Sequence, residues 1–565
     1  MRPHLDERPA FLLSVNILTL LAGLIALFFL LTNGVPFVQA GWIHELGKKG
    51  RYVLPMMISV PIFAILMFLT WWKFRAIFDG LRVVKCWQGV CRIPFRYTAT
   101  GFFVIYGAMM AVVGFERQLA LETRAFDLGL FAQAVWNTLQ GDFLFCSIKE
   151  NIILLGDHVS PILLVTAPFY AIWPDPRMLV LLQALAAASS FFPLALIARD
   201  KLKDRSVVMI LLLMFFFFQP MRAALHEDFH PEVLAEPFLW WAFFFLDRGK
   251  VVRFLLCLAV AVTGKENFLG VAFMLGFYAC VWKKMRWTGS LVMATSVVLL
   301  LWETKWLVPR LSGAVYFYGG NYSRMLADPV HGVLQRLLSL ESLDYVFKIF
   351  VPFLFFPFIH LPTLFLVFPV LFQNLLSVNG AMRSFNYHYV TGMTPFLFIS
   401  TIYALSRLHD QKAWFRKCLL PAGFLLLTVS LIRSGPSEYW FFWNIHSHRS
   451  AHTDMIRKKL GEISAGARVL THNALVPQMC NRKYIYQFNY NSKPDKSNFA
   501  EKYKADTVVW DRIYWEPGTE SLETSLHRLR SAGFSVAFEK DGFYILKKTA
   551  ALAPLSKYDA VTSTD

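Results

Sequence analysis

The sequence predicts an all-α protein that crosses a membrane many times, with about 13 transmembrane helices and a small C-terminal α/β domain outside the membrane. Of the 565 residues, 56% are hydrophobic and 17% are charged, whereas about 25% of the residues in soluble domains are charged. Apolar runs recur along the chain as far as residue 433, and the composition then becomes more polar. After that point helix-like and strand-like runs alternate, which is typical of an α/β domain.

Thirteen apolar runs are long enough, at roughly 15 to 24 residues, to cross a bilayer if tilt and helix breaks are allowed. They are residues 9–32, 53–72, 98–115, 178–198, 206–221, 232–247, 251–264, 267–283, 288–308, 344–359, 362–378, 390–406 and 418–433. The first run has no convincing small-residue cleavage site, so we interpret it as an anchor. Residues 160–174 are apolar but short and end in Pro-Asp-Pro, which indicates a helix that dips into the outer leaflet.

The formal net charge of +18 is compatible with nucleic-acid binding, but the positions of the basic residues favour membrane orientation instead. They form five clusters between apolar runs, within residues 73–97, 199–205, 248–253, 283–286 and 407–417. Thirteen spans and a cytoplasmic N-terminus place all five in the cytoplasm, as the positive-inside rule requires, and only the cluster at residues 48–51 disagrees. The intervals outside are then residues 116–177, 222–231, 309–343 and 379–389. We predict a multi-pass protein of the plasma (inner) membrane, with no nucleic-acid partner.

This topology divides the chain into four regions. Residues 1–97 form an N-terminal transmembrane hairpin and a basic cytoplasmic loop, and residues 98–433 form the transmembrane core. The core includes a long outer loop at residues 116–177, and loops of this length usually carry function. Residues 435–548 form the outward-facing α/β domain, and residues 549–565 form a disordered tail. The seven cysteines show neither a disulfide framework nor the spacing of a zinc site.

Two acids of the long loop are candidates for chemistry. Asp127 stands between Phe126 and Leu128, where it would be either a helix N-cap or a carboxylate in a partly dry pocket. Desolvation would raise its pKa toward the range of a general base. Asp157 precedes His158 at the start of the dipping helix. This pair is either a capped surface turn or a phosphate site made by His158 and backbone amides.

The segment His226-Glu227-Asp228-Phe229-His230 matches the H-E-x-x-H pattern of zinc metalloproteases. That pattern needs both imidazoles on one face of a helix, but Pro231 follows directly and disfavours helical backbone at His230. We favour a polar cluster at a helix mouth facing the long loop, formed by Arg222, His226, Glu227, Asp228 and His230. A polar cap that only ends two helices remains the alternative.

Lys265 and Glu266 interrupt an apolar stretch. Ionisable residues at membrane depth are costly and therefore indicate function. The alternative is a pair that neutralises itself at a tight turn.

Further along the chain, the outer side carries more cations and aromatic residues. They are Arg383 and His388, together with Tyr318, Tyr322 and Arg324. The cations would bind a lipid phosphate and the tyrosines would stack on a sugar, although anchoring at the membrane interface explains such residues as well.

Several motifs resemble one family. The motifs are FDLGLFAQAVWNTLQG, GDHVSPILLVTAPFYAIWPDP, LLQALA, HEDFHPE, GKEN and NYHYVTGMTPFLF, and they span roughly residues 98–410. In this order they resemble the predicted-membrane-protein family catalogued as domain of unknown function 2079. That family is similar to the GT-C superfamily of integral-membrane glycosyltransferases. The resemblance implies a long first outer loop with a catalytic acid, a surface helix after it, a second outer loop with acids, and polyprenyl-phosphate-linked sugars as donors.

The resemblance assigns roles residue by residue. Asp127 matches the first-loop acid, and Asp157 with His158 matches the pair that opens the surface helix, although Val159-Ser160-Pro161 replaces the usual double proline. The second-loop acids correspond to Glu227 and Asp228. Lys265 matches a lysine that commonly follows a glycine-rich span.

The resemblance implies transfer of a sugar from a polyprenyl-phosphate donor to an acceptor glycan, lipid or protein on the outer face, with membrane lipid around the protein. The catalytic residues would be Asp127, Glu227 and Asp228, the last two assisting or holding a divalent ion (Mg or Mn). The substrate- and phosphate-binding residues would be Asp157, His158, Arg222, His226, His230, Lys265, Glu266, Arg383 and His388. The alternatives are a transporter or flippase of lipid-linked or small polar solutes and, on the H-E-x-x-H pattern, a membrane metalloprotease. A protein that only binds lipid-linked sugar is a further alternative.

Overall fold

The computed structural model describes residues 93–322, 328–434, 449–488, 499–513 and 522–548, with the single residue Gly89 before them. The predicted spans at 9–32 and 53–72, nearly all of the basic loop before residue 97, Arg324 and the tail from residue 549 lie outside the described residues. The chain forms two compact units. The membrane unit comprises the described residues of Met1–Val112, His158–Ile162 and Leu181–Trp443. The loop–sheet unit comprises those of Val113–Asp157, Leu163–Val180 and Asn444–Asp565.

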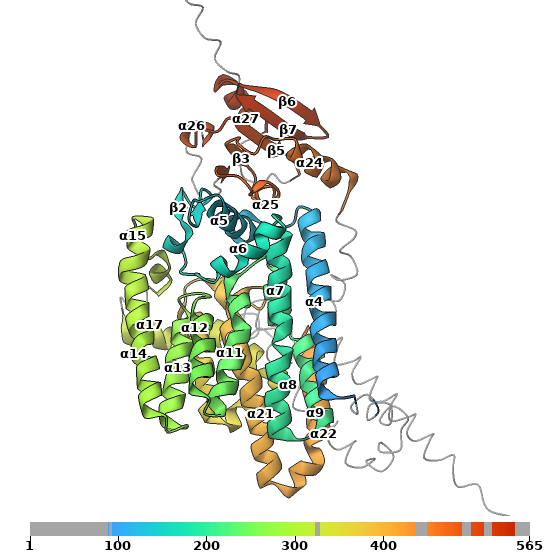
Figure 1. Ribbon diagram of the computed structural model, residues 1–565, viewed down its shortest axis with the longest axis vertical. Coiled ribbons are helices and arrows are strands. Elements are labelled where there is room, and N and C mark those ends of the chain that lie inside the picture. Colours follow the sequence, from blue (N-terminus) through green and yellow to red (C-terminus); the bar gives the residue numbers. More distant parts are fainter. Residues whose placement is uncertain are drawn as a thin grey trace, which may run out of the picture. The chain divides into compact units, whose positions relative to one another are not determined.

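The membrane unit is helical (Figure 1). Two helices, α4 (Phe95–Leu119) and α7 (Arg177–Ser189), begin in one unit and end in the other. The further helices of the membrane unit are α8 (Phe191–Leu202), α9 (Arg205–Phe216), α10 (Gln219–His226), α11 (Pro231–Asp247), α12 (Val251–Val262), α13 (Phe268–Val281), α14 (Arg286–Trp302), α15 (Val308–Ser312), α17 (Pro329–Leu337), α18 (Leu340–Phe350), α19 (Leu361–Leu364), α20 (Phe368–Leu376), α21 (Thr394–Gln411) and α22 (Ala413–Ser434). The prediction of a polytopic all-α core is confirmed.

Five helical segments among the described residues are long and apolar enough to cross a membrane. They are Phe95–Leu119, Arg177–Leu202, Arg205–His226, Arg286–Ser312 and His388–Gln411. Other apolar runs form shorter helices, and the predicted spans at 344–359 and 362–378 are divided into short α and 3₁₀ segments. Prolines within these runs explain the division, because each removes a backbone hydrogen bond of a continuing helix. The count of thirteen spans stays a prediction.

Two of the predicted cytoplasmic clusters meet at one end of the helices, around Asp247 at the end of α11. The ammonium groups of Lys201 and Lys283 lie 2.9 and 2.7 Å from its carboxylate, and the Tyr403 hydroxyl donates to it at 2.5 Å. Since α11 has 17 residues, its first residue lies about 25 Å away, near the thickness of a bilayer core. The basic clusters and the start of α11 therefore lie at opposite ends of one apolar helix.

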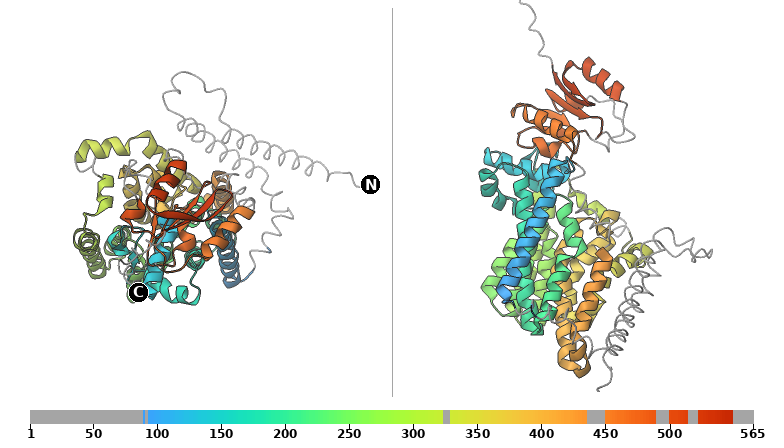
Figure 2. Two further views of the ribbon diagram at one scale, coloured as in Figure 1. Left: turned by 90° about the horizontal axis from the view of Figure 1, so that it is seen from above. Right: turned by 90° about the vertical axis from the view of Figure 1, so that its right-hand side faces the viewer.

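The loop–sheet unit contains the predicted α/β domain, whose five strands form one sheet in the order β4-β3-β5-β7-β6. The strands are β3 (Val469–Thr471), β4 (Ile485–Gln487), β5 (Thr507–Asp511), β6 (Phe534–Lys540) and β7 (Phe543–Lys548), and the helices are α24 (Ala451–Gly461), α25 (Val476–Met479), α26 (Phe499–Lys502) and α27 (Leu522–Ser531). Both β4 and β5 run parallel to β3, β7 is antiparallel to β5 and β6, and α27 packs on β6 (Figure 2). The α/β prediction is confirmed.

The sequence explains the turn between β6 and β7. The β6–β7 hairpin turns at Asp541-Gly542, where both residues have positive φ (52° and 81°), and Asp-Gly is a preferred pair for such a turn.

The long loop contributes β1 (Phe145–Cys146), β2 (Ile152–Ile153), α5 (Leu130–Leu139) and α6 (Leu163–Ile172) to the loop–sheet unit. The ten-residue α6 is the short helix expected within residues 160–174, and it is too short to span a bilayer.

His472, directly after β3, makes the stability of the sheet dependent on pH. It is 1% exposed and packs near Phe488 and Trp510, and burial lowers its pKa to about 3 from 6.5. The unfolded chain therefore binds more protons between pH 6.5 and 3, and stability falls as the pH drops through this window. We expect a loss of about 3 kcal/mol between pH 7 and pH 4.

Hydrogen–deuterium exchange of the β3 and β5 peptides in the full-length protein measures this loss, after correction for the pH dependence of intrinsic exchange. His472→Gln should remove most of the pH dependence. An unchanged dependence in that variant would show that other groups cause it.

Candidate functional site

The HEDFH segment is a break between two helices. Helix α10 ends at His226, Asp228 has a φ of +79°, and α11 begins at Pro231. A proline at the first position of a helix leaves no backbone donor unsatisfied there, so the sequence favours a new helix at this point. The two histidines do not share a helix face, and the helical geometry of an H-E-x-x-H metalloprotease is absent from these residues.

Gln183 on α7 fixes the shape of this break. Its side chain is fully buried; its Nε2 donates to the carbonyl oxygen of Asp228 at 2.6 Å, and its Oε1 accepts from the backbone N–H of His230 at 2.5 Å. A buried amide that binds one donor and one acceptor of the same turn stabilises one backbone conformation. Gln183 was not predicted from the sequence, although a polar side chain within an apolar run indicates a buried hydrogen-bonding role.

The break places Glu227 against the 388–393 segment. Glu227 Oε2 accepts from the backbone N–H of His388 at 2.8 Å and lies 2.9 Å from its Nδ1. The His388 ring stacks on the His230 ring with centroids 3.7 Å apart. Thr391 donates its hydroxyl to the His388 carbonyl at 2.6 Å, which helps hold this short 3₁₀ segment in place.

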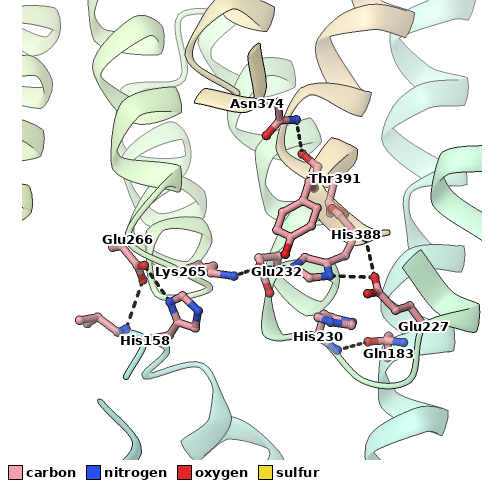
Figure 3. A network of polar contacts seen from close by, with 12 residues as sticks. His158, Gln183, Glu227, His230, Glu232, Lys265, Glu266, Asn374, His388 and Thr391 are labelled. Carbon is pink, nitrogen blue, oxygen red and sulfur yellow. Dashed lines mark hydrogen bonds and ion pairs between the residues drawn. The ribbon is translucent and has the colours of Figure 1, made fainter. Parts of the chain in front are cut away.

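Lys265 and Glu266 point to different partners (Figure 3). Lys265 Nζ lies 2.5 Å from Glu232 Oε1 on the first turn of α11, whereas Glu266 Oε1 lies 2.8 Å from His158 Nδ1. A Cβ on Gly264 would lie 2.4 Å from the Cβ of Ala235, so a glycine is needed for the Lys265 turn to approach α11 this closely. The self-neutralising pair considered from the sequence is therefore not what forms.

Aromatic side chains from residues 316–322 contact Glu266 and His158. The Tyr316 hydroxyl donates to Glu266 Oε1 at 2.6 Å, and the Tyr318 ring stacks on the His158 ring at 4.1 Å. Tyr322 donates to the carbonyl of Gln373 at 3.4 Å. Two of these tyrosines were singled out from the sequence, and Tyr316 was missed.

These contacts form one row of ionisable groups within the membrane unit, which we call the polar network: Glu227, His230, His388, Glu232, Lys265, Glu266 and His158. Glu232 connects its two halves, because Glu232 Oε1 binds Lys265 and also lies 3.6 Å from His388 Nε2. Most members are buried. Charges buried this far from water need partners close by, and the network supplies them.

Glu232 is the main member that the sequence analysis missed. It follows Pro231 within the HEDFHPE motif quoted above, at the first turn of an apolar helix. An acid at the start of an apolar helix could have indicated Glu232 from the sequence, because the helix dipole favours negative charge there.

Other predicted site residues have different surroundings. Asp127 and Asp157 belong to the loop–sheet unit, where Asp157 pairs with Lys149 at 3.0 Å. Arg383 donates to the Ser377 carbonyl at 2.6 Å and to Glu341 at 3.2 Å. Its positive charge is therefore paired with the Glu341 carboxylate. Arg222 and His226 lie on α10, Arg222 is buried, and Asp228 forms the turn described above.

Three members of the network offer a set of metal ligands. The ligand atoms of Glu227, His230 and His388 lie within 4.8 Å of one another. In a tetrahedral site with bonds of about 2.0–2.1 Å, two ligand atoms lie about 3.4 Å apart, so the side chains would hold an ion after shifts of about an ångström. Two imidazoles and a carboxylate suit Zn²⁺ or Mn²⁺ better than Mg²⁺, which prefers oxygen ligands.

We expect the purified protein to bind about one Zn²⁺ or Mn²⁺ per chain, because the three ligands belong to one cluster. Elemental analysis after chelation and reloading measures the stoichiometry. Glu227→Gln and His388→Ala should each lower the affinity at least tenfold. The control is His331→Ala, which replaces an exposed histidine paired only with Asp328 among its described contacts; full stoichiometry in His388→Ala would contradict the site.

The chain is an integral membrane protein with the fold of the GT-C glycosyltransferases. The solved structure of ArnT from Cupriavidus metallidurans bound to undecaprenyl phosphate is similar to this chain, with a TM-score of 0.51 and 13% identity over 80% of this chain and 99% of that one. ArnT from the same organism in the apo state gives a TM-score of 0.49 and 14% identity over the same shares. Among curated proteins nothing matches.

The chain belongs to the predicted membrane protein family DUF2079, whose profile matches residues 117–545. The family resemblance drawn from the motifs is thereby confirmed. The match extends beyond the membrane core and includes most of the C-terminal domain.

Proposed function

We propose that this protein transfers a sugar from a polyprenyl-phosphate donor to an acceptor at the outer face of the membrane. The observation that carries the proposal is the polar network, which holds a lysine with a side chain only 14% exposed and three histidines at the end of apolar helices opposite the basic clusters. The GT-C fold supports it, and the similar ArnT structure contains undecaprenyl phosphate.

The network has the chemistry of a phosphate site. As the bond between the sugar and the lipid phosphate breaks, negative charge grows on the phosphate oxygens, and groups placed in advance stabilise that charge best. Lys265 has three N–H donors, of which Glu232 needs one, so a phosphate oxygen can accept another. His158, once protonated, would donate its second ring N–H in the same way, while Glu266 holds its Nδ1.

The acceptor hydroxyl needs a base, and we assign this role to Asp127. The oxygen of the acceptor forms a bond to the anomeric carbon, its proton passes to the Asp127 carboxylate, and the polyprenyl phosphate leaves with the electron pair of the broken bond. Asp127 is half-buried in a five-residue π-helical turn, η2 (Ala125–Gly129). Partial burial favours a base because it weakens the hydration of the carboxylate.

A divalent cation bound by Glu227, His230 and His388 would add positive charge for the donor phosphate. In this role Glu227 is a metal ligand, and Asp228 shapes the turn through its backbone carbonyl. Tyr318 would offer a stacking surface for the sugar ring beside His158.

One observation favours the transporter as the second candidate. Glu236 is fully buried in the interior of α11, where its carboxyl group accepts from Ser190 and Trp240, each at 2.6 Å. An ionisable group at membrane depth is typical of proton and solute pathways. It lies between the polar network and Asp247 on the same helix.

The testing experiment places the full-length protein in lipid vesicles with a panel of polyprenyl-phosphate sugars and follows loss of the sugar from the lipid. Turnover with at least one donor supports the glycosyltransferase. If no donor is consumed, but a lipid or solute crosses the vesicle and Glu236→Gln stops that movement, the transporter replaces it.

A further inference from the structure

We propose that the C-terminal sheet holds the turn that carries Asp127, with Asn473 as a positioning residue for that acid. The role of Asp127 rests on the proposed function, whereas the contacts that hold the turn do not. All the residues concerned belong to the loop–sheet unit.

The turn lacks a cap of its own. Arg124, at the N-cap position of η2, makes no side-chain hydrogen bond to the first backbone N–H groups, which have no partner within a helix. Asn473 supplies one, because its Oδ1 accepts from the backbone N–H of Ala125 at 2.7 Å. An asparagine 348 residues further along the chain thus does the work of an N-cap, two residues before Asp127.

The last residue of the turn, Gly129, packs closely against α25. A Cβ on Gly129 would lie 3.0 Å from Val476 Cγ1 and 3.6 Å from Pro477 Cγ, so the glycine permits α25 to pack directly on the turn. Gln478 Nε2, also on α25, donates to the carbonyl of Gln118 at 2.6 Å. The turn is therefore held at its first and last residues, and α25 also binds the end of α4 at Gln118, seven residues before the turn.

The position of Asn473 in the sheet explains this arrangement. It follows β3, and the parallel strands β4, β3 and β5 end at the same edge. In open α/β sheets this carboxyl edge, next to the central strand where the strand order reverses, is where ligands bind. Here Asn473 presents its side chain from that edge to the chain's own loop. The domain thus acts as a scaffold for the turn. A domain that bound the acceptor of the sugar would instead keep this edge open for the acceptor.

Loss of the Asn473 contact should not detach the domain, because separate contacts join it to the loop. The fully buried Gln133 donates to the carbonyls of Arg482 and Lys483 at 3.1 and 3.0 Å. The Ser147 hydroxyl donates to the carbonyl of Ile485 at 2.7 Å and accepts from its N–H at 2.9 Å. These bonds cover the free edge of β4 and would remain in an Asn473 variant.

The experiment compares Asn473→Ala, Asn473→Asp and Asn481→Ala in the full-length protein. Asp keeps the acceptor oxygen. Asn481 also joins the domain to the loop, through the Pro174 carbonyl at 2.6 Å and Tyr170 at 2.6 Å, but it does not contact the turn in any described bond. The readouts are hydrogen–deuterium exchange of residues 123–130 and the kcat and KM of sugar transfer.

We expect Asn473→Ala to raise exchange at the turn about fivefold, as loss of a helix cap does, and to lower kcat with an unchanged donor KM. Asn473→Asp should restore both values, and Asn481→Ala should leave both unchanged. Normal exchange or normal kcat in Asn473→Ala overturns the proposal, as does a failure of Asp to restore them. If wild type consumes no donor while the exchange pattern follows expectation, the proposed function fails and the structural contact stands.

Discussion

Asp127→Asn should lower sugar transfer by about 10²–10⁴-fold, because an amide of the same shape cannot take the proton of the acceptor hydroxyl. The KM for the donor should change little, since the residues proposed to bind the phosphate are unchanged. Asparagine has nearly the same volume as aspartate, so the π-helical turn should persist. Initial rates in vesicles, measured over a range of donor concentrations, give both constants.

A matched control is available in the same loop. Asp142 pairs with Lys483 at 2.8 Å in an exposed position, and Asp142→Asn makes the same chemical change without touching the turn. Its rate should stay within about twofold of wild type, since exposed ion pairs contribute little. Equal losses in both variants would mean that the loop needs its charge in general and that Asp127 is not the base.

Lys265→Met should destabilise the protein by about 3–5 kcal/mol, because Glu232 would be left as a buried charge without its lysine. Lys265 and Glu232 side chains are only 14% and 5% exposed, so solvent screening offsets little of this cost. The same variant should lose measurable binding of a polyprenyl phosphate. Unfolding in detergent and a lipid-binding titration measure the two effects.

The double variant Glu232→Gln with Lys265→Met separates stability from binding. Removing both charges should recover most of the stability, whereas binding should stay lost if Lys265 contacts the phosphate. Lys283→Met is the matched control, since this lysine pairs with Asp247 at the other end of α11. Recovery of lipid binding in the double variant would contradict the role of Lys265.

Periodic and local features of the sequence determined much of the architecture. Long apolar runs predicted the helical membrane core, and alternating patterns with an Asp-Gly turn predicted the C-terminal strands, because helix and strand formation respond mainly to neighbouring residues. Pro231 after His230 correctly indicated a helix break in the HEDFH segment. The order of motifs also identified the family.

Only the tertiary structure decided the partners of the polar residues. From the sequence Lys265 and Glu266 were considered as one pair and Asp157 and His158 as another, yet Lys265 binds Glu232 and His158 binds Glu266. A charged side chain pairs with whichever opposite charge the packing of helices brings within a few ångströms, and sequence separation does not limit that choice. Asn473 shows the same principle over 348 residues, because an unsatisfied N–H at a turn donates to any oxygen that the fold places beside it.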